Sequence, residues 1–162
     1  MILGHSEVIR RIKEDRLVEG GAEEFVQGAG MDIRVGKMHT LKSGGKLLAG
    51  SRETPNIEEV SGSTYFIKPG EYFLIETIEK VNMPLDLAAR MLPRSTLQRS
   101  GMYLFHALID PGYSGKLVFG IKNLGEFVFE LEKGARIAQL CFEQVSGESK
   151  EYKGRYQGGK VV

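Results

Sequence analysis

The chain has 162 residues and a net charge of +1, with 41% hydrophobic and 27% charged residues. This composition is typical of a soluble globular protein, and the length suits a single domain with a core of its own. The near-zero net charge argues against strong electrostatic attraction to nucleic acid or to a membrane surface.

Cysteine content and apolar stretches narrow the protein class further. The single cysteine, Cys141, excludes an intrachain disulfide and a zinc site built on paired cysteines, and its apolar surroundings predict a small core residue. The start of the chain lacks the apolar segment of a secretory signal, and no stretch approaches the roughly 18 apolar residues of a membrane span. We therefore expect a cytoplasmic protein.

The first third of the chain predicts one helix and one strand. Residues 6–16 carry a short apolar stripe at helical spacing, with Ser6 as the N-cap, and the Gly20–Gly21 pair is expected to end this helix. A strand is predicted over residues 31–35. Residues 36–62 are polar and glycine-rich with little periodicity, so we interpret them as a variable loop region with no more than one edge strand.

The rest of the chain consists of short apolar runs between turns. Turn signals recur roughly every eight to twelve residues, which favours a sandwich or barrel over alternating βαβ units. We predict a mainly β fold, a distorted barrel or jelly roll, with the N-terminal helix and one short internal helix. The tail over residues 146–162 is polar and glycine-rich, and we expect it to be mobile. The predicted strands lie in "TYFIK", "EYFLIETIEKV", "KLVFGIKN", "FVFEL" and "RIAQLCFEQV".

The stretch "PRSTLQRSG" is the first candidate for chemistry. Ser95 to Gln98 matches a capping box, and Gly101 would end a short helix. Free backbone amides at the helix start, two hydroxyls and the flanking Arg94 and Arg99 would form an anion site. A capped helix with two solvated arginines is equally compatible with this stretch.

The second candidate lies in "HALIDPGYSGKLVFGIKNLG". Asp110 precedes a Pro-Gly turn, where a carboxylate often only caps the turn, so a functional role requires that it face the anion site. Gly120 interrupts the following apolar run and is expected to mark a bulge or a close approach of a ligand to the backbone. The three histidines show no metal-ligand spacing: they are His5, His39 and His106.

Together these pieces resemble the dUTPase and dCTP deaminase superfamily over most of the chain. The opening "MILGHSEVIRRI" and the longer "RSTLQRSG" are more similar to the dCTP deaminase branch. The resemblance implies a dUTPase-like β-clip fold, one domain over residues 1–162, a tail that covers the active site, and a homotrimer with shared active sites. Five motifs of the trimeric dUTPases have counterparts in the same order: "AGMDI" at 29–33, "PRST" at 93–96, "LIDPGYSG" at 108–115, "KGARIAQLCF" at 133–142 and "GRYQGG" at 154–159.

The resemblance also separates the two reactions of the superfamily. The deaminase branch normally carries a glutamate ten residues after the motif-three aspartate, which moves protons while water attacks C4 of cytosine. Counted from Asp110, that position is Gly120, which cannot transfer a proton, and the zinc-dependent route needs paired cysteines. The resemblance therefore implies that Asp110 acts as the general base for a water that attacks the α-phosphate of dUTP, releasing dUMP and pyrophosphate.

The remaining roles follow from the resemblance. Mg²⁺ would be held by the triphosphate and by water, without a direct protein ligand. Plain packing remains an alternative for Tyr113, and a strand-end hydrogen bond for Gln139. The resemblance assigns the phosphates to Arg94, Ser95, Thr96, Arg99 and Gln139, with Arg155 of the tail, and the base and sugar to Ala107, Leu108, Tyr113, Tyr156 and Gln157.

Departures from the family pattern leave further functions open. The deaminase branch has a lysine at Arg155 and a glutamine at Gly159, unless Gln157 serves instead, and only Tyr156 could replace the phenylalanine that stacks over uracil. A dCTP deaminase or a bifunctional enzyme is disfavoured by Gly120. A pyrophosphatase of relaxed base specificity and a non-catalytic nucleotide-binding trimer stay open as well, and Asp110 speaks against the non-catalytic trimer. No nucleic-acid or membrane partner is expected.

Overall fold

Strands dominate the structure, as the sequence predicts. In the computed structural model, which describes residues 1–162, 46% of the residues lie in strands and 12% in helices. The prediction of a mainly β fold with two helices is confirmed. The helices are α1 (His5–Asp15) and α2 (Ser95–Arg99), with a 3-10 turn, η1 (Glu23–Phe25), between α1 and the main strands. Neither α-helix is long and apolar enough to cross a membrane.

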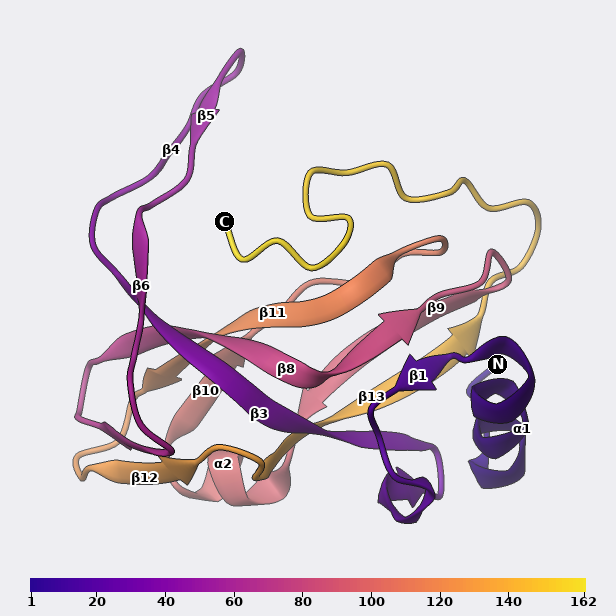
Figure 1. Ribbon diagram of the computed structural model, residues 1–162, viewed down its shortest axis with the longest axis horizontal. Coiled ribbons are helices and arrows are strands. Elements are labelled where there is room, and N and C mark those ends of the chain that lie inside the picture. Colours follow the sequence, from indigo (N-terminus) through magenta and orange to yellow (C-terminus); the bar gives the residue numbers. More distant parts are fainter.

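One antiparallel sheet organises the chain (Figure 1). Its strand order is β10-β11-β8-β3-β13-β9, and short strands β1, β2 and β6 pair alongside it. Two small two-stranded sheets lie outside it: β4 and β5 form a hairpin, and β7 pairs with β12 from a distant part of the chain. The bounds are β1 (Val18–Glu19), β2 (Val26–Gln27), β3 (Gly30–Leu41), β4 (Lys46–Leu47), β5 (Arg52–Glu53), β6 (Ile57–Glu59), β7 (Thr64–Ile67), β8 (Tyr72–Asn82), β9 (Leu87–Pro93), β10 (Met102–Phe105), β11 (Ser114–Asn123), β12 (Phe129–Glu132) and β13 (Arg136–Gln144).

The sheet curls until its two ends nearly meet. The segment that follows β10 forms an isolated antiparallel bridge with β9 at the other end, between Ile109 and Ala89. This bridge makes the sheet an almost closed barrel, because it joins the last strand of the sheet order to the segment that directly follows the first.

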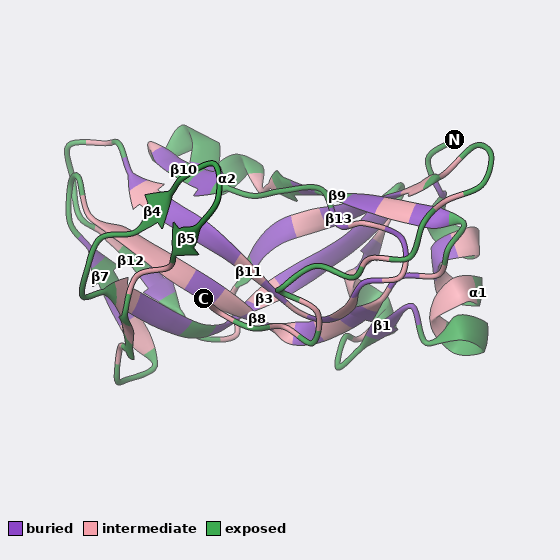
Figure 2. Ribbon diagram, turned by 90° about the horizontal axis from the view of Figure 1, so that it is seen from above, coloured by how far each residue is buried: buried purple, intermediate pink, exposed green.

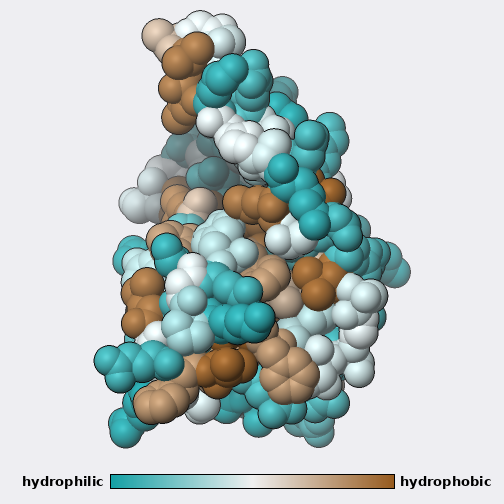
Figure 3. Space-filling model, turned by 90° about the vertical axis from the view of Figure 1, so that its left-hand side faces the viewer, coloured by the Kyte–Doolittle hydropathy of each residue, from teal (hydrophilic) through white to brown (hydrophobic).

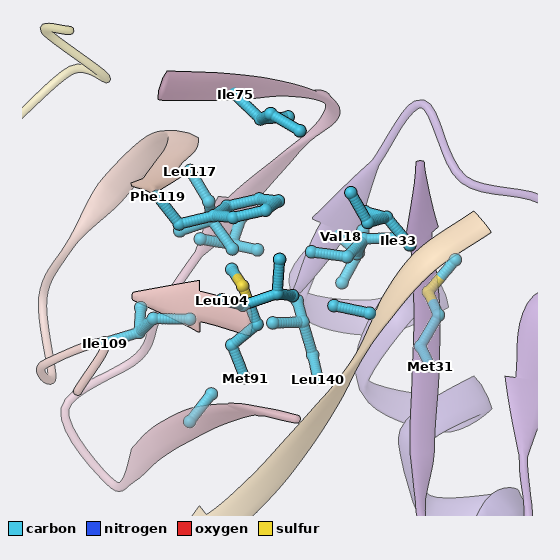
Figure 4. Packing of buried hydrophobic residues seen from close by; sticks show 14 of the residues in the cluster. Val18, Met31, Ile33, Ile75, Met91, Leu104, Ile109, Leu117, Phe119 and Leu140 are labelled. Carbon is cyan, nitrogen blue, oxygen red and sulfur yellow. The ribbon is translucent and has the colours of Figure 1, made fainter. Parts of the chain in front are cut away.

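The barrel interior holds a single cluster of apolar side chains (Figures 2 and 4). Along β11, Leu117, Phe119 and Ile121 alternate into the core, which turns Val118 and Gly120 to the opposite face of the strand. Cys141 is buried on β13, in agreement with the prediction of a core residue.

The first helix differs in its ends from the prediction. Its N-cap is Gly4, and no side chain caps it, so Ser6 lies within the first turn. The helix ends at Arg16, which adopts a left-handed conformation with φ of 53°, well before the Gly20–Gly21 pair. The reason is tertiary: the chain turns back there because Leu17, the next residue, is fully buried in the core.

Residues 36–62 contain more strand than the single edge strand that the sequence predicted. β3 continues to Leu41, and β6 pairs with its second half; β4 and β5 form an arm that projects from the barrel (Figures 1 and 3). Leu47 and Leu48 near the tip of this arm are exposed. Ladder hydrogen bonds to β8 and β6 hold this part of β3, and a weak hydropathy pattern does not reveal them.

Candidate active site

A cavity of about 710 Å³ opens beside β11. Its walls come from β8, β10 and β11, from residues 106–110, and from the tail, and most of the lining side chains are hydrophobic. Asp110 is the only acidic side chain in this lining. A mainly apolar cavity with a few polar groups is the usual form of a small-molecule site.

The closing bridge of the barrel fixes the position of Asp110. Ile109 donates its amide to the carbonyl of Ala89 at 2.9 Å and accepts the amide of Ala89 at 3.0 Å. The turn after Asp110 is held by the amide of Met83, which donates to the carbonyl of Tyr113 at 2.8 Å. Asp110 closes this turn with its backbone carbonyl, and its carboxylate has no hydrogen bond or ion pair within the chain. The carboxylate therefore does not cap the turn.

Tyr113 is the last residue of this turn, since its amide donates to the carbonyl of Asp110 at 3.2 Å. Its ring is buried beside the cavity and meets Tyr152 of the tail edge to face, with ring centroids 5.6 Å apart. Its hydroxyl donates to the carbonyl of Lys116 at 2.6 Å, and burial raises the pKa of Tyr113 to about 12. A neutral, anchored ring of this kind can form a flat wall for a sugar, and it also serves packing.

Gly120 lies opposite the end of β10 in a regular part of the sheet. It pairs with Phe105 on one side and Leu74 on the other, and the register shift in β11 falls earlier, between Lys116 and Val118. The expectation of a bulge at Gly120 is therefore wrong. A β-carbon there would collide with the phenol of Tyr72, whose Cε2 and Cζ would lie 2.7 Å away. The close approach is made by a tyrosine of β8.

The predicted phosphate residues gather at another place, where β9 leads into α2. Arg94 is the N-cap of α2, and no side chain caps the helix, so the predicted capping box does not form. The helix starts directly at the end of β9, where the amide of Arg94 donates to the carbonyl of Ile137 at 3.2 Å. Ser95, Thr96 and Arg99 are exposed on this helix.

Asp32, buried on β3, pairs with two arginines near this second group. Its Oδ2 lies 3.7 Å from Nε of Arg94 and 3.3 Å from Nη1 of Arg136. Gln139 stands opposite Asp32 in the ladder between β3 and β13. Sequence reasoning missed the roles of Asp32 and Arg136, although Asp32 lies in the quoted motif "AGMDI" and was a visible signal.

Within one copy of the chain the two groups are separate. None of the predicted phosphate-binding side chains lines the cavity at Asp110. Ala107 and Leu108, predicted to read the base, do line it and are exposed there. The structure therefore brings the predicted catalytic and base residues together, but not the predicted phosphate residues.

The tail runs above β11 and lies against the turn that carries Asp110 (Figure 1). Oε1 of Gln157 accepts the amide of Ser114 at 2.9 Å, and its Nε2 donates to the carbonyl of Gly112 at 2.9 Å. Tyr156 lines the cavity, whereas Arg155 reaches Oγ1 of Thr54 at 3.2 Å, at the base of the arm. The mobility of the tail and its contacts with a nucleotide stay predictions.

Comparisons with known proteins identify relatives of this chain. The family model described as "dCTP deaminase-like" matches residues 2–145. The chain is 37% identical over 135 residues to the "Probable deoxyuridine 5'-triphosphate nucleotidohydrolase" of Methanothermobacter thermautotrophicus, covering 83% of this chain and 89% of that protein. It is 34% identical over 151 residues to the dCTP deaminase of Thermococcus kodakarensis, covering 93% and 90%.

Among solved structures, the dCTP deaminase from Agrobacterium tumefaciens is similar with a TM-score of 0.69 and 19% identity. The match covers 90% of this chain but 49% of the other, so this chain spans about half the length of that protein. At this identity the likeness concerns the fold.

Proposed function

Because this chain belongs to the dCTP deaminase-like family, we propose that it hydrolyses dUTP to dUMP and pyrophosphate. The observation that carries the proposal is the pairing of Asp110 with Gly120 in one cavity. Asp110 is the only acidic side chain there, and the position on β11 that could have held a second one is occupied by the Tyr72 ring. Hydrolysis needs one general base, whereas deamination needs a group that also transfers protons at C4 of the cytosine ring.

Asp110 supplies that base. Its unpaired carboxylate would accept a proton from water as the water oxygen bonds to the α-phosphorus, and the bond from that phosphorus to the bridging oxygen breaks to release pyrophosphate. A positioned carboxylate contributes on the order of 10² to 10⁴ in rate. The Ile109–Ala89 bridge supports the role, because it holds the carboxylate at a fixed place.

Negative charge on the phosphates needs neutralisation from elsewhere. The chain has no cluster of three or more His, Cys, Asp or Glu side chains that could hold a metal, so Mg²⁺ would arrive on the triphosphate oxygens. Bound there, it would neutralise phosphate charge. Arg94 and Arg99 on α2 would donate to the same oxygens, with Asp32 holding Arg94.

The separation of α2 from the cavity supports a site shared between copies. The active unit would then be a closed homo-oligomer, a trimer by family resemblance, in which α2 of one copy faces the cavity of the next. Mixing Asp110→Asn protein with Arg94→Ala protein, after reversible dissociation, tests this. Activity should return on mixing, because some sites then receive both native residues. Absence of any recovery would refute sharing.

The reaction itself is tested by parallel incubations with Mg²⁺ and either dUTP or dCTP, with the nucleotides resolved by anion exchange. Conversion of dUTP to dUMP with dCTP unchanged is the expected result. Formation of dUTP or dUMP from dCTP would instead support dCTP deamination or a bifunctional enzyme. This is the alternative function, because several relatives are named dCTP deaminase.

A further inference from the structure

Tyr72 and Asp110 both line the cavity. Residues 106–110 begin beside Gly120, because Phe105 pairs with Gly120, and they end at Asp110. The Tyr72 ring crosses over Gly120 and meets Phe105 edge to face, with ring centroids 5.7 Å apart. The cavity therefore has a carboxylate at one end of this segment and a phenol at the other.

The Tyr72 hydroxyl is free to bind a ligand, unlike the hydroxyl of Tyr113. Tyr113 also lines the cavity, and its hydroxyl donates to the carbonyl of Lys116. The Tyr72 hydroxyl has no hydrogen-bond partner in the protein. The hydroxyl is also not fully buried, and Tyr72 lines the cavity, so a ligand in the cavity can reach it. Burial raises the pKa of Tyr72, which keeps the hydroxyl neutral and able to donate.

The shape of the substrate decides what this hydroxyl would meet. With the α-phosphate at Asp110 and the pyrimidine along Ala107 and Leu108, the base extends toward Tyr72. The 4-position of a pyrimidine lies across the ring from N1, which carries the sugar, so its substituent points farthest from the phosphates. That substituent is a carbonyl oxygen in uracil, a good acceptor for a phenol.

We propose that Tyr72 binds the base by donating its hydroxyl to the 4-oxygen of uracil, and that Gly120 lacks a side chain to make room for this tyrosine. The inference rests on the proposed function and deepens it. The hydroxyl can also rotate to accept from the 4-amino group of cytosine. Tyr72 therefore selects for a polar 4-substituent and does not by itself separate uracil from cytosine.

A thermodynamic cycle between protein and ligand tests the proposal. The ligand is the deoxynucleoside triphosphate whose base is pyrimidin-2-one, which lacks the 4-oxygen and also the proton on N3. For the native protein, replacing dUTP by this analogue should raise KM by at least about 10-fold, because the analogue loses the contact at the 4-oxygen together with any contact to the N3 proton. Tyr72→Phe should raise KM for dUTP about 10-fold and leave kcat unchanged, whereas KM for the analogue should be the same in the variant and in the native protein.

Tyr65→Phe is the matched control. Tyr65 is a buried tyrosine on β7 that does not line the cavity, so this variant should keep the native KM for both ligands. Gly120→Ala gives a second variant, since its methyl group displaces the Tyr72 ring and should also raise KM for dUTP. Thermal melts establish that each variant is folded.

The outcomes separate this inference from the proposed function. The Tyr72 contact is refuted, and the hydrolysis stands, if the native protein turns over dUTP but Tyr72→Phe keeps the native KM. The contact is also refuted if Tyr72→Phe raises KM for the analogue as much as it raises KM for dUTP. If the native protein does not hydrolyse dUTP, the proposed function fails. Calorimetric binding of dUTP and of the analogue then completes the same cycle for Tyr72.

Discussion

Ile109 and Ala89 exchange two backbone hydrogen bonds, of 2.9 and 3.0 Å, and this single bridge both closes the barrel and places Asp110. The proposed general base thus directly follows the bridge that closes the barrel. Neither side chain of the bridge takes part in the chemistry, and both are buried. Because the bridge holds the backbone of Asp110 in place, its carboxylate needs no hydrogen bond or ion pair to the protein and stays available to a ligand.

Replacing Asp110 by asparagine should abolish turnover while nucleotide binding remains. The amide keeps the shape of the carboxylate but cannot take the proton, so we expect kcat for dUTP to fall by roughly 10² to 10⁴. Steady-state kinetics and calorimetric titration measure the two effects. Asp15→Asn, at the end of α1, should leave both unchanged. Substantial residual activity in Asp110→Asn would contradict the general-base role.

Asp32→Asn should weaken binding of the triphosphate more than binding of the nucleoside. The change removes the negative charge that holds Arg94 and Arg136, so we expect affinity for dUTP to fall about 10-fold. Affinity for deoxyuridine should change little, and titration of both ligands gives the comparison. Glu143→Gln, which breaks the exposed pair with Arg90, is the control. Equal losses for both ligands would indicate a general structural effect.

Gln157→Ala should release the tail from the turn after Asp110. The variant loses the hydrogen bonds to Ser114 and Gly112, so the tail should open more often. Limited trypsin digestion at the lysines and Arg155 of the tail should proceed about 10-fold faster, in proportion to the open population. Gln144→Ala, at the exposed end of β13, serves as the comparison. Identical cleavage rates in all three proteins would show that Gln157 does not hold the tail.

Gly30→Ala should destabilise the fold strongly, whereas Gly28→Ala should not. Gly30 has φ of 134°, and its β-carbon would meet the backbone carbonyl of Leu140 across the β3–β13 ladder. We expect a loss of at least about 2 kcal/mol, and a fall of roughly 5 °C or more in Tm. Gly28 has nothing within 4 Å of such a carbon, so its variant should melt close to the native protein. Similar melting of the two variants would contradict the packing described for Gly30.

The stability of the fold should fall above about pH 10, in part through Tyr113. Burial raises the pKa of Tyr113 to about 12, against about 10 for an exposed tyrosine. The contribution is fully present below about 10 and is lost as the pH rises toward 12, because only the unfolded chain ionises readily. Denaturant unfolding of the native protein and of Tyr113→Phe over this range should show a shallower decline for the variant. Parallel declines would mean that other groups cause the loss.

The sequence predicted the strands best where side chains alternate between core and surface. The runs at 64–67 and 72–82 and the three runs after residue 114 all form strands, because alternation decides which face of a strand is buried. The end of α2 just before Gly101 is also as predicted, but the prediction failed for residues 36–62, for both ends of α1 and for the N-cap of α2. There, ladder hydrogen bonds and the burial of Leu17 decide the conformation, and neither leaves a local pattern.

By itself, the sequence determined the family and the mainly β fold and made Asp110 the candidate base, because ordered motifs and hydropathy are properties of the chain alone. Only the tertiary structure decided which side chains meet. Strand pairing brings Tyr72 over Gly120, and Asp32 beside Arg94, from distant parts of the chain. It also keeps α2 away from the cavity at Asp110. Alternation along a strand specifies which face a residue occupies, but the register between strands specifies its neighbours, and that register is fixed only when the whole barrel closes.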